Sequence, residues 1–191
     1  EVDLNRPREK AVYRKPEDAW GLKVWKTGLP GPIVERSLEI HDKFYTDAYQ
    51  LLKSLEDKFG RFVVLDLHSY CHQRNGPDAP FDSPRANPDI NLGTATMNRN
   101  LWANVIERFI SDLSQKEVLR KPLDVRENIR FKGGYFPFWV HKTFPQTGCC
   151  LAIEIKKTFM NEWSGQLDKA AFNDIKKALR AAVPGLMETL K

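Results

Sequence analysis

The fold is decided by the stretch Phe62-Val63-Val64-Leu65-Asp66-Leu67, which runs directly into His68-Ser69. Every residue of the stretch except Asp66 is apolar, so both faces of a strand formed here would be hydrophobic. A strand that is apolar on both faces is typical of a central parallel strand with helices on each side of the sheet. The stretch therefore predicts an α/β fold, with polar chemistry beginning where the strand ends.

A long helix is predicted before this strand. Apolar residues recur at three- and four-residue spacing over residues 33–59, and Gly60 stands where a helix C-cap belongs. Short apolar runs then alternate with helical patterns, which is the order of an α/β chain. We expect strands at 2–4, 125–131 and 149–155, and helices at 101–113 and 167–179, the last running on past Pro184. Two long loops, 7–32 and 69–96, are expected to be functional.

The composition is that of a globular protein, with 191 residues, 41% of them apolar and 29% charged. A single domain over residues 1–191 is expected, and no apolar run approaches the ~20 residues that cross a bilayer. The chain opens without Met inside a strand-like segment and shows no signal peptide. We therefore expect an upstream segment and no membrane association.

Charge and cysteine content bear on the binding partner and on the cellular compartment. The 30 basic and 25 acidic residues give a net charge of +5 that is spread along the chain, which argues against a nucleic-acid partner. The three cysteines include the adjacent pair Cys149 and Cys150, and this odd count favours a reducing, cytoplasmic compartment. The oligomeric state is left open by the sequence.

Polar side chains stand at or near the ends of three expected strands. Asp3, Asn5 and Arg6 follow the first, Asp66, His68 and Ser69 close the second, and Glu154 lies in the third. In a parallel sheet such ends converge on one crevice. His68 is either a structural histidine or a metal ligand, and the ligand interpretation is favoured because Asp66, on the same face, is placed to fix its tautomer.

Glu154 lies inside an otherwise apolar strand, where an unpaired carboxylate is costly to bury. It either forms a buried salt bridge, to Lys156 or Arg130, or acts as a general base toward a metal-bound water. Arg6 is suited to bidentate capture of a carboxylate, although exposed arginines are common.

The remaining histidines and the cysteines are weaker candidates. His72 is interpreted as a loop residue and His41 as part of the helix packing, while His141 is a possible pocket residue. A Cys149 or Cys150 nucleophile is not expected, because an apolar strand raises a thiol pKa.

Five motifs in order resemble the N-formylglutamate amidohydrolase family. They are Asp3-Leu4-Asn5-Arg6-Pro7, Asp66-Leu67-His68-Ser69, Pro88-Asp89-Ile90-Asn91-Leu92-Gly93-Thr94, Phe131-Lys132-Gly133-Gly134-Tyr135 and Ala152-Ile153-Glu154-Ile155. The resemblance implies a three-layer α/β/α sandwich with a mostly parallel central sheet, similar to the zinc carboxypeptidases and related to succinylglutamate desuccinylases and aspartoacylases. It also implies a catalytic zinc.

The resemblance implies a role for each matching position. His68 would be a zinc ligand and Glu154 the general base and acid. Asn5 and Arg6 would hold the substrate carboxylate, Asp3 would orient another ligand histidine, and Gly133, Gly134 and Tyr135 would line the pocket. Since catalytic zinc takes three protein ligands, the others are expected upstream of residue 1.

The function favoured is that of a zinc-dependent amidohydrolase acting on a small anionic N-acyl amino acid, N-formylglutamate-like. One alternative is a metal-free pseudoenzyme or carboxylate-binding protein of the same fold, and another is a peptide carboxypeptidase or cell-wall amidase. The apolar segment Phe136-Pro137-Phe138-Trp139-Val140 replaces a basic segment of the family. The acyl group and the amino acid therefore stay open.

Overall fold

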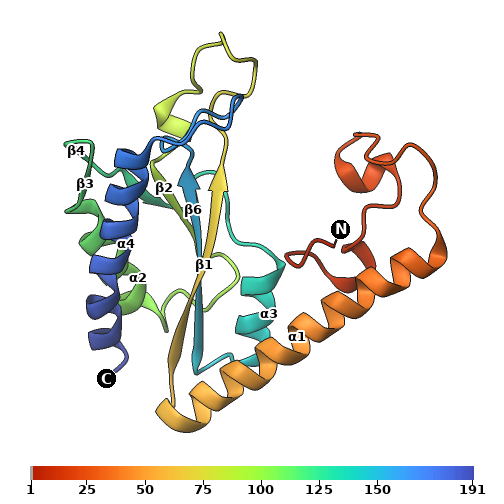
Figure 1. Ribbon diagram of the computed structural model, residues 1–191. Coiled ribbons are helices and arrows are strands. Elements are labelled where there is room, and N and C mark those ends of the chain that lie inside the picture. The colour runs from red at the N-terminus through yellow and green to blue at the C-terminus, as the bar shows by residue number, and fades with distance from the viewer. Residues whose placement is uncertain (1) are drawn as a thin grey trace.

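The computed structural model describes residues 2–191 and shows a sheet with helices on both faces (Figure 1). The α-helices are α1 (Gly31–Phe59), α2 (Ala103–Ser114), α3 (Tyr135–Thr143) and α4 (Lys169–Thr189). The main sheet contains β1 (Phe62–Tyr70), β2 (Ile90–Gly93), β5 (Val125–Glu127) and β6 (Gly148–Lys156). The strands β3 (Glu117–Val118) and β4 (Lys121–Pro122) form a separate hairpin.

The strand order of the main sheet is β1-β6-β2-β5. β1 runs parallel to β6 and β2 runs parallel to β5, whereas β2 and β6 are antiparallel. The sheet is therefore mostly parallel, as the sequence predicts. β1 and β6 pair along their whole lengths, from Phe62 opposite Gly148 to Tyr70 opposite Lys156, so their carboxyl ends meet at one edge of the sheet.

Separate cores on the two faces of the sheet give the three layers. On one face, α2 and α4 cover the strands, with Phe109 and Ile175 packed against Leu151 and Ile153 of β6. On the other face, α1 and α3 pack on a smaller cluster made of Leu52, Phe62, Val140, Phe144 and Cys150. Successive side chains of a strand point to opposite faces, which places Asp66, His68 and Glu154 on the α1/α3 face.

The long predicted helix is confirmed as α1. It buries Val34, Leu38, His41 and Leu52 along one stripe, in agreement with the helical period. Gly60 ends it with a positive φ of 76°, and its N–H donates to Glu56 O at 2.7 Å. A glycine marks the C-terminal end of α1 in the sequence because few other residues adopt that backbone conformation without strain.

The strand predicted at residues 2–4 is wrong. The Asp3 N–H donates to Ala11 O at 2.7 Å, and the Asn5 N–H donates to Asp3 Oδ1 at 2.9 Å, so the segment forms a turn. Aspartate side chains that bond nearby backbone groups compete with strand pairing in this way. Only β1 and β6, and not three strands, end at the expected crevice.

Two other expectations about elements need correction. The segment 69–96 is not one loop, because it contains β2, a strand of four fully buried residues that is too short to show alternation. The strand expected at 125–131 ends at Glu127, since Asn128 takes a positive φ of 56° and turns the chain. Within residues 2–191, no helix combines the length and hydrophobicity that crossing a bilayer requires.

Candidate functional site

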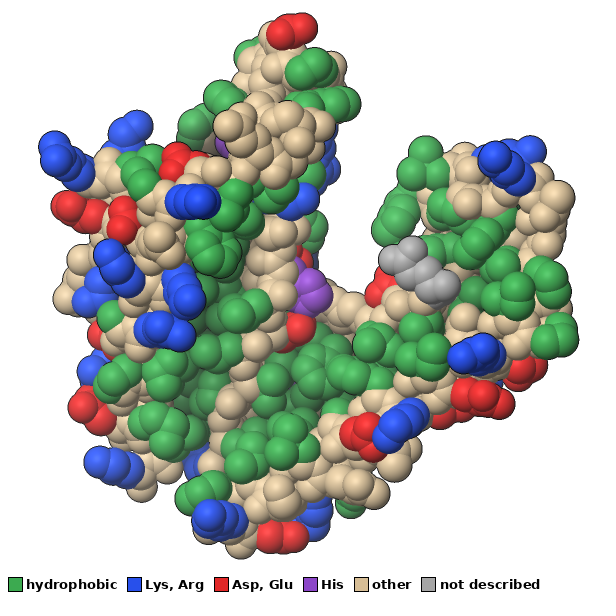
Figure 2. Space-filling view, viewed as in Figure 1, with side chains coloured by type: hydrophobic (Ala, Val, Ile, Leu, Met, Phe, Trp, Pro, Cys, Tyr) green, Lys and Arg blue, Asp and Glu red, His purple; other side chains and the backbone are tan. Residues whose placement is uncertain are grey.

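A cavity of about 440 Å³ lies at the carboxyl end of β1. The residues around it come from residues 2–30, here called the N-terminal arm, and from β1, α1 and α3; they are Val2, Asp3, Leu4, Asn5, Tyr13, Phe44, Asp66, His68 and Phe136. Figure 2 shows a deep hollow between the arm and the body that holds the sheet, with histidine and acidic side chains along it. Two of the sequence motifs, the one at Asp3 and the one at Asp66, thus meet in one place.

Asp66 and His68 form a hydrogen-bonded pair on one face of β1. The His68 Nε2 lies 2.9 Å from Asp66 Oδ1. The His68 side chain is 34% exposed and the Asp66 side chain 14% exposed. The hydrogen bond to Asp66 raises the pKa of His68, and the nearby carboxylates of Glu154 and Asp3 act in the same direction against burial. The pair orients the ring and leaves Nδ1 without a partner among residues 2–191.

Glu154 stands beside this pair because His68 and Glu154 are register partners on parallel strands. Burial raises the pKa of Glu154, Asp66 adds to the rise, and His68 opposes it. The buried salt bridge expected as an alternative is wrong for the described residues, since Lys156 pairs with Asp89 at 2.6 Å and Arg130 donates to Asn87. A half-buried carboxyl with a raised pKa is suited to accepting and returning a proton.

The arm is fixed to the helices by hydrogen bonds to its backbone and to one asparagine. The Phe136 N–H, in the first turn of α3, donates to Asn5 Oδ1 at 2.9 Å. The Tyr45 hydroxyl donates to Leu4 O at 2.7 Å, and His41 Nε2 lies 2.9 Å from Arg6 O. His41 is therefore more than the packing residue that the sequence suggests.

Arg6 is held beside the cavity and does not line it. Its guanidinium carbon lies 4.6 Å from the Tyr13 ring centroid and 4.9 Å from that of Trp20. Its Nη1 donates to Asp18 O at 2.8 Å, and its Nε lies 3.5 Å from Asp3 Oδ2. These contacts occupy Nη1 and Nε of the guanidinium.

The glycine turn at 132–134 supports the site from outside the cavity. Gly133, Gly134 and Tyr135 are not among the residues that line it, which corrects the expectation, whereas the next residue, Phe136, is. A Cβ on Gly134 would collide with the Asn5 side chain, so this glycine allows the arm to approach. Tyr135 packs instead on α1, with its ring centroid 5.7 Å from that of Tyr45.

The described residues fit only part of a catalytic zinc site. Asp66 Oδ2 is buried without a hydrogen-bond partner, so this oxygen could bind a cation or accept a hydrogen bond. His68 Nδ1 could also bind a cation. However, residues 2–191 contain no group of three or more His, Cys, Asp or Glu side chains that could hold a metal ion. Catalytic zinc takes three protein ligands, so these residues alone do not make a complete site.

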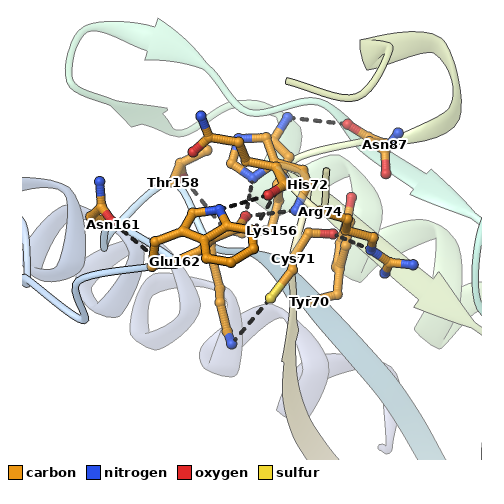
Figure 3. A network of polar contacts seen from close by, with 12 residues as sticks. Tyr70, Cys71, His72, Arg74, Asn87, Lys156, Thr158, Asn161 and Glu162 are labelled. Atoms are coloured by element: carbon orange, nitrogen blue, oxygen red, sulfur yellow. Dashed lines mark hydrogen bonds and ion pairs between the residues drawn. The ribbon is translucent and has the colours of Figure 1, made fainter. Parts of the chain in front are cut away.

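One polar cluster at the same end of the sheet was missed by sequence reasoning. Glu162, only 5% exposed, accepts the N–H groups of His72 and Gln73 and lies 2.6 Å from His72 Nδ1 (Figure 3). These bonds help to lower the pKa of Glu162 although burial opposes them. Glu162 therefore fastens the loop after β1, and the isolated acidic residue in the sequence gave no sign of its partners.

His141 and the two adjacent cysteines are structural. His141 Nε2 accepts the Cys150 N–H at 2.9 Å, and its Nδ1 lies 3.0 Å from Thr96 Oγ1, so the ring does not line the cavity. Burial lowers the pKa of His141 to about 4. Burial also raises the pKa of Cys149 to about 12 and that of Cys150 well above its usual value, which confirms that neither thiol is activated.

Comparison with known proteins supports the resemblance. The family model for N-formylglutamate amidohydrolase matches residues 1–160. A solved structure of N-formylglutamate amidohydrolase from Ralstonia eutropha JMP134 matches with a TM-score of 0.64 and 17% sequence identity, over 86% of this chain. The chain spans 56% of the length of that protein. No curated protein matches the chain.

Proposed function

Because this chain belongs to the N-formylglutamate amidohydrolase family, we propose that it hydrolyses the amide bond of a small N-acyl amino acid. The observation that carries the proposal is the placement of Asp66, His68 and Glu154 on one face of two paired strands, where Asp66 and His68 line a cavity and Glu154 lies opposite His68. An amidohydrolase needs a proton acceptor beside a pocket that admits a water and the acyl group, and this arrangement supports both requirements.

In the proposed reaction, Glu154 takes a proton from a water whose oxygen attacks the acyl carbon. The carbon–nitrogen bond then breaks, and Glu154 returns the proton to the departing amine. Burial raises the pKa of Glu154, which makes its carboxylate a stronger base toward the water than that of an exposed glutamate. Arg6 Nη2 and Asn5 hold the substrate carboxylate and so orient the scissile bond.

We also propose that zinc is the cofactor and that His68 is the ligand offered by these residues. Asp66 orients the ring of His68. A bound zinc would polarise the acyl carbonyl, while its other ligands are proposed to come from outside the 191 residues. Asp3 accepts from the Tyr13 hydroxyl at 2.6 Å and is proposed to orient one such ligand. The three free cysteines support a reducing compartment such as the cytoplasm.

One observation favours a second candidate, a carboxylate-binding protein without catalytic metal. It is the lack, among residues 2–191, of a third metal-ligating side chain near His68. In that case the arm and cavity would bind the N-acyl amino acid without cleaving it.

The two candidates are separated by assaying amine release from N-formyl amino acids, together with zinc analysis of the purified protein. We expect zinc-dependent hydrolysis in the natural protein and a loss of at least 100-fold in kcat for Glu154→Gln, by the size of general-base effects. Glu162→Gln is the matched control, because the Glu162 carboxylate accepts the N–H groups of His72 and Gln73 and is not a register partner of His68. Binding without hydrolysis or zinc would favour the second candidate, and full activity in Glu154→Gln would exclude the mechanism.

A further inference from the structure

Four basic side chains meet in a second cavity, which lies within the N-terminal arm and has a volume of about 210 Å³. Its walls come from two segments of the arm, 14–16 and 23–28. The charged residues that line it are all basic; they are Arg14, Lys15, Lys23 and Lys26. This cavity, here called the basic hollow, shares no lining residue with the cavity at the end of β1. It is therefore a separate candidate site.

The positive charge of the basic hollow is not balanced by nearby carboxylates. Among residues 2–191, no ion pair involves any of its four basic side chains. The acidic residues of the segment 14–28 are Glu17 and Asp18, and neither lines the hollow. Asp18 Oδ2 instead accepts the backbone N–H groups of Arg14 and Lys15, at 3.0 and 3.1 Å. The hollow thus combines four cations and no acidic side chain.

A hydrogen bond holds the two walls of the basic hollow together. The Trp25 Nε1–H donates to Tyr13 O at 2.6 Å, which joins the segment 23–28 to the residue directly before Arg14. The basic side chains of both segments are therefore kept near one another by a neutral contact. Like charges held close together repel, and an anion bound between them would replace this repulsion by attraction.

We propose that the basic hollow binds a small anion of the diphosphate type, either free pyrophosphate or the phosphate groups of a nucleoside diphosphate. A single carboxylate carries one charge, which one arginine can pair, whereas a diphosphate carries several charges and is suited to several lysine ammonium groups with an arginine. The hollow is smaller than the ~300–1,000 Å³ pockets that enclose drug-sized ligands, so only a small anion, or the charged end of a larger molecule, would enter it. The inference goes beyond the proposed function, because it concerns a different cavity.

Isothermal titration calorimetry of the natural protein with four probes tests this inference. The probes are pyrophosphate, ADP, succinate and a short single-stranded oligonucleotide. We expect pyrophosphate and ADP to bind, with succinate at least about 10-fold weaker because each of its carboxylates carries one charge. Tighter binding of ADP than of pyrophosphate would identify a nucleotide as the source of the diphosphate, and the reverse order would identify the free anion.

Three variants locate the binding site. Lys23→Gln and Lys26→Gln should each raise the dissociation constant for pyrophosphate about 10-fold, as expected for the loss of one charged hydrogen-bond donor. Lys10→Gln is the matched control, because Lys10 is an exposed lysine of the same arm that does not line the hollow. It removes the same charge and should leave the dissociation constant unchanged. Bound pyrophosphate should also slow amide hydrogen exchange in residues 23–28.

The contrary outcomes are equally specific. An equal loss of affinity in Lys10→Gln would mean that the net charge of +5 attracts anions without a defined site, and would overturn the inference. Equal binding of succinate, tighter binding of the oligonucleotide than of pyrophosphate, or no binding at all would also overturn it. Because every readout is binding or hydrogen exchange, these results leave the hydrolase proposal to its own assay.

Discussion

Replacing Asn91 with alanine should release the glycine turn from the sheet and disable the site without disrupting the rest of the fold. Asn91 is fully buried on β2, opposite Glu154. Its Nδ2 donates to Phe131 O at 2.8 Å, and its Oδ1 accepts the Arg130 N–H at 2.8 Å. The turn that follows leads into α3, whose Phe136 holds Asn5.

The magnitude follows from the two backbone groups that Asn91→Ala would leave unpaired. Each buried unpaired group costs about 1–3 kcal/mol, so the free energy of unfolding should fall by about 2–6 kcal/mol. Leu113→Ala is the control, because Leu113 is fully buried in α2 on the opposite face of the sheet and should lose about 2–5 kcal/mol. The two variants are thus matched in stability but not in position.

Urea unfolding, amide hydrogen exchange and kcat/KM together read out this prediction. In Asn91→Ala, the Phe136 amide should exchange faster because Asn5 loses its fixed acceptor geometry, and kcat/KM should fall at least 10-fold below that of Leu113→Ala. Unchanged exchange at Phe136, or equal activity in the two variants, would refute the reasoning that β2 supports the site through the turn.

Three further predictions concern individual residues. Burial holds the pKa of His141 in the folded state at about 4, below the ~6.5 of an unfolded histidine, so the neutral ring contributes stability above pH ~6.5 that is lost as the pH falls toward ~4. This loss amounts to about 3 kcal/mol in denaturant titrations across that range, and His141→Gln should flatten the slope. Gly93→Ala should lower stability by about 1–3 kcal/mol, measured by thermal unfolding, because its Cβ would lie 2.6 Å from Gly133 N. A thiol reagent should label the half-buried Cys71 in the native protein and reach the two thiols of β6 only after unfolding; equal labelling rates would contradict their burial.

The parts of the fold that follow from local patterns could be predicted from the sequence. The apolar run 62–67 predicted a strand covered on both faces, and the spacing of apolar residues before Gly60 predicted α1. Both predictions work because burial on two faces, or along one stripe of a helix, determines where apolar residues stand in the sequence. The short strand β2 shows no such pattern, since all four of its residues are buried, and apolar and polar residues therefore do not alternate with burial. Residues 2–4 read as a strand because their composition does not show the side-chain bonds of Asp3 that turn the chain.

Those residues of the candidate site that lie in or at the ends of predicted strands could be located from the sequence. Asp66, His68 and Glu154 could be placed together from their positions in two neighbouring strands. Partners set by long-range packing were not predictable. The stacking of Arg6 on Tyr13 and Trp20 depends on how the arm folds back, and the bond from Phe136 to Asn5 joins positions 131 residues apart.

A double-mutant cycle between His68 and Glu154 tests most directly whether these two side chains work as one reaction centre. The cycle compares kcat/KM of the natural protein with His68→Asn, Glu154→Gln and the double variant, each first checked for folding by circular dichroism. Groups that act as a unit give strongly non-additive losses, so the double variant should be about as impaired as the worse single variant. Losses that simply multiply, or a single variant with full activity, would contradict a shared centre at the carboxyl ends of β1 and β6.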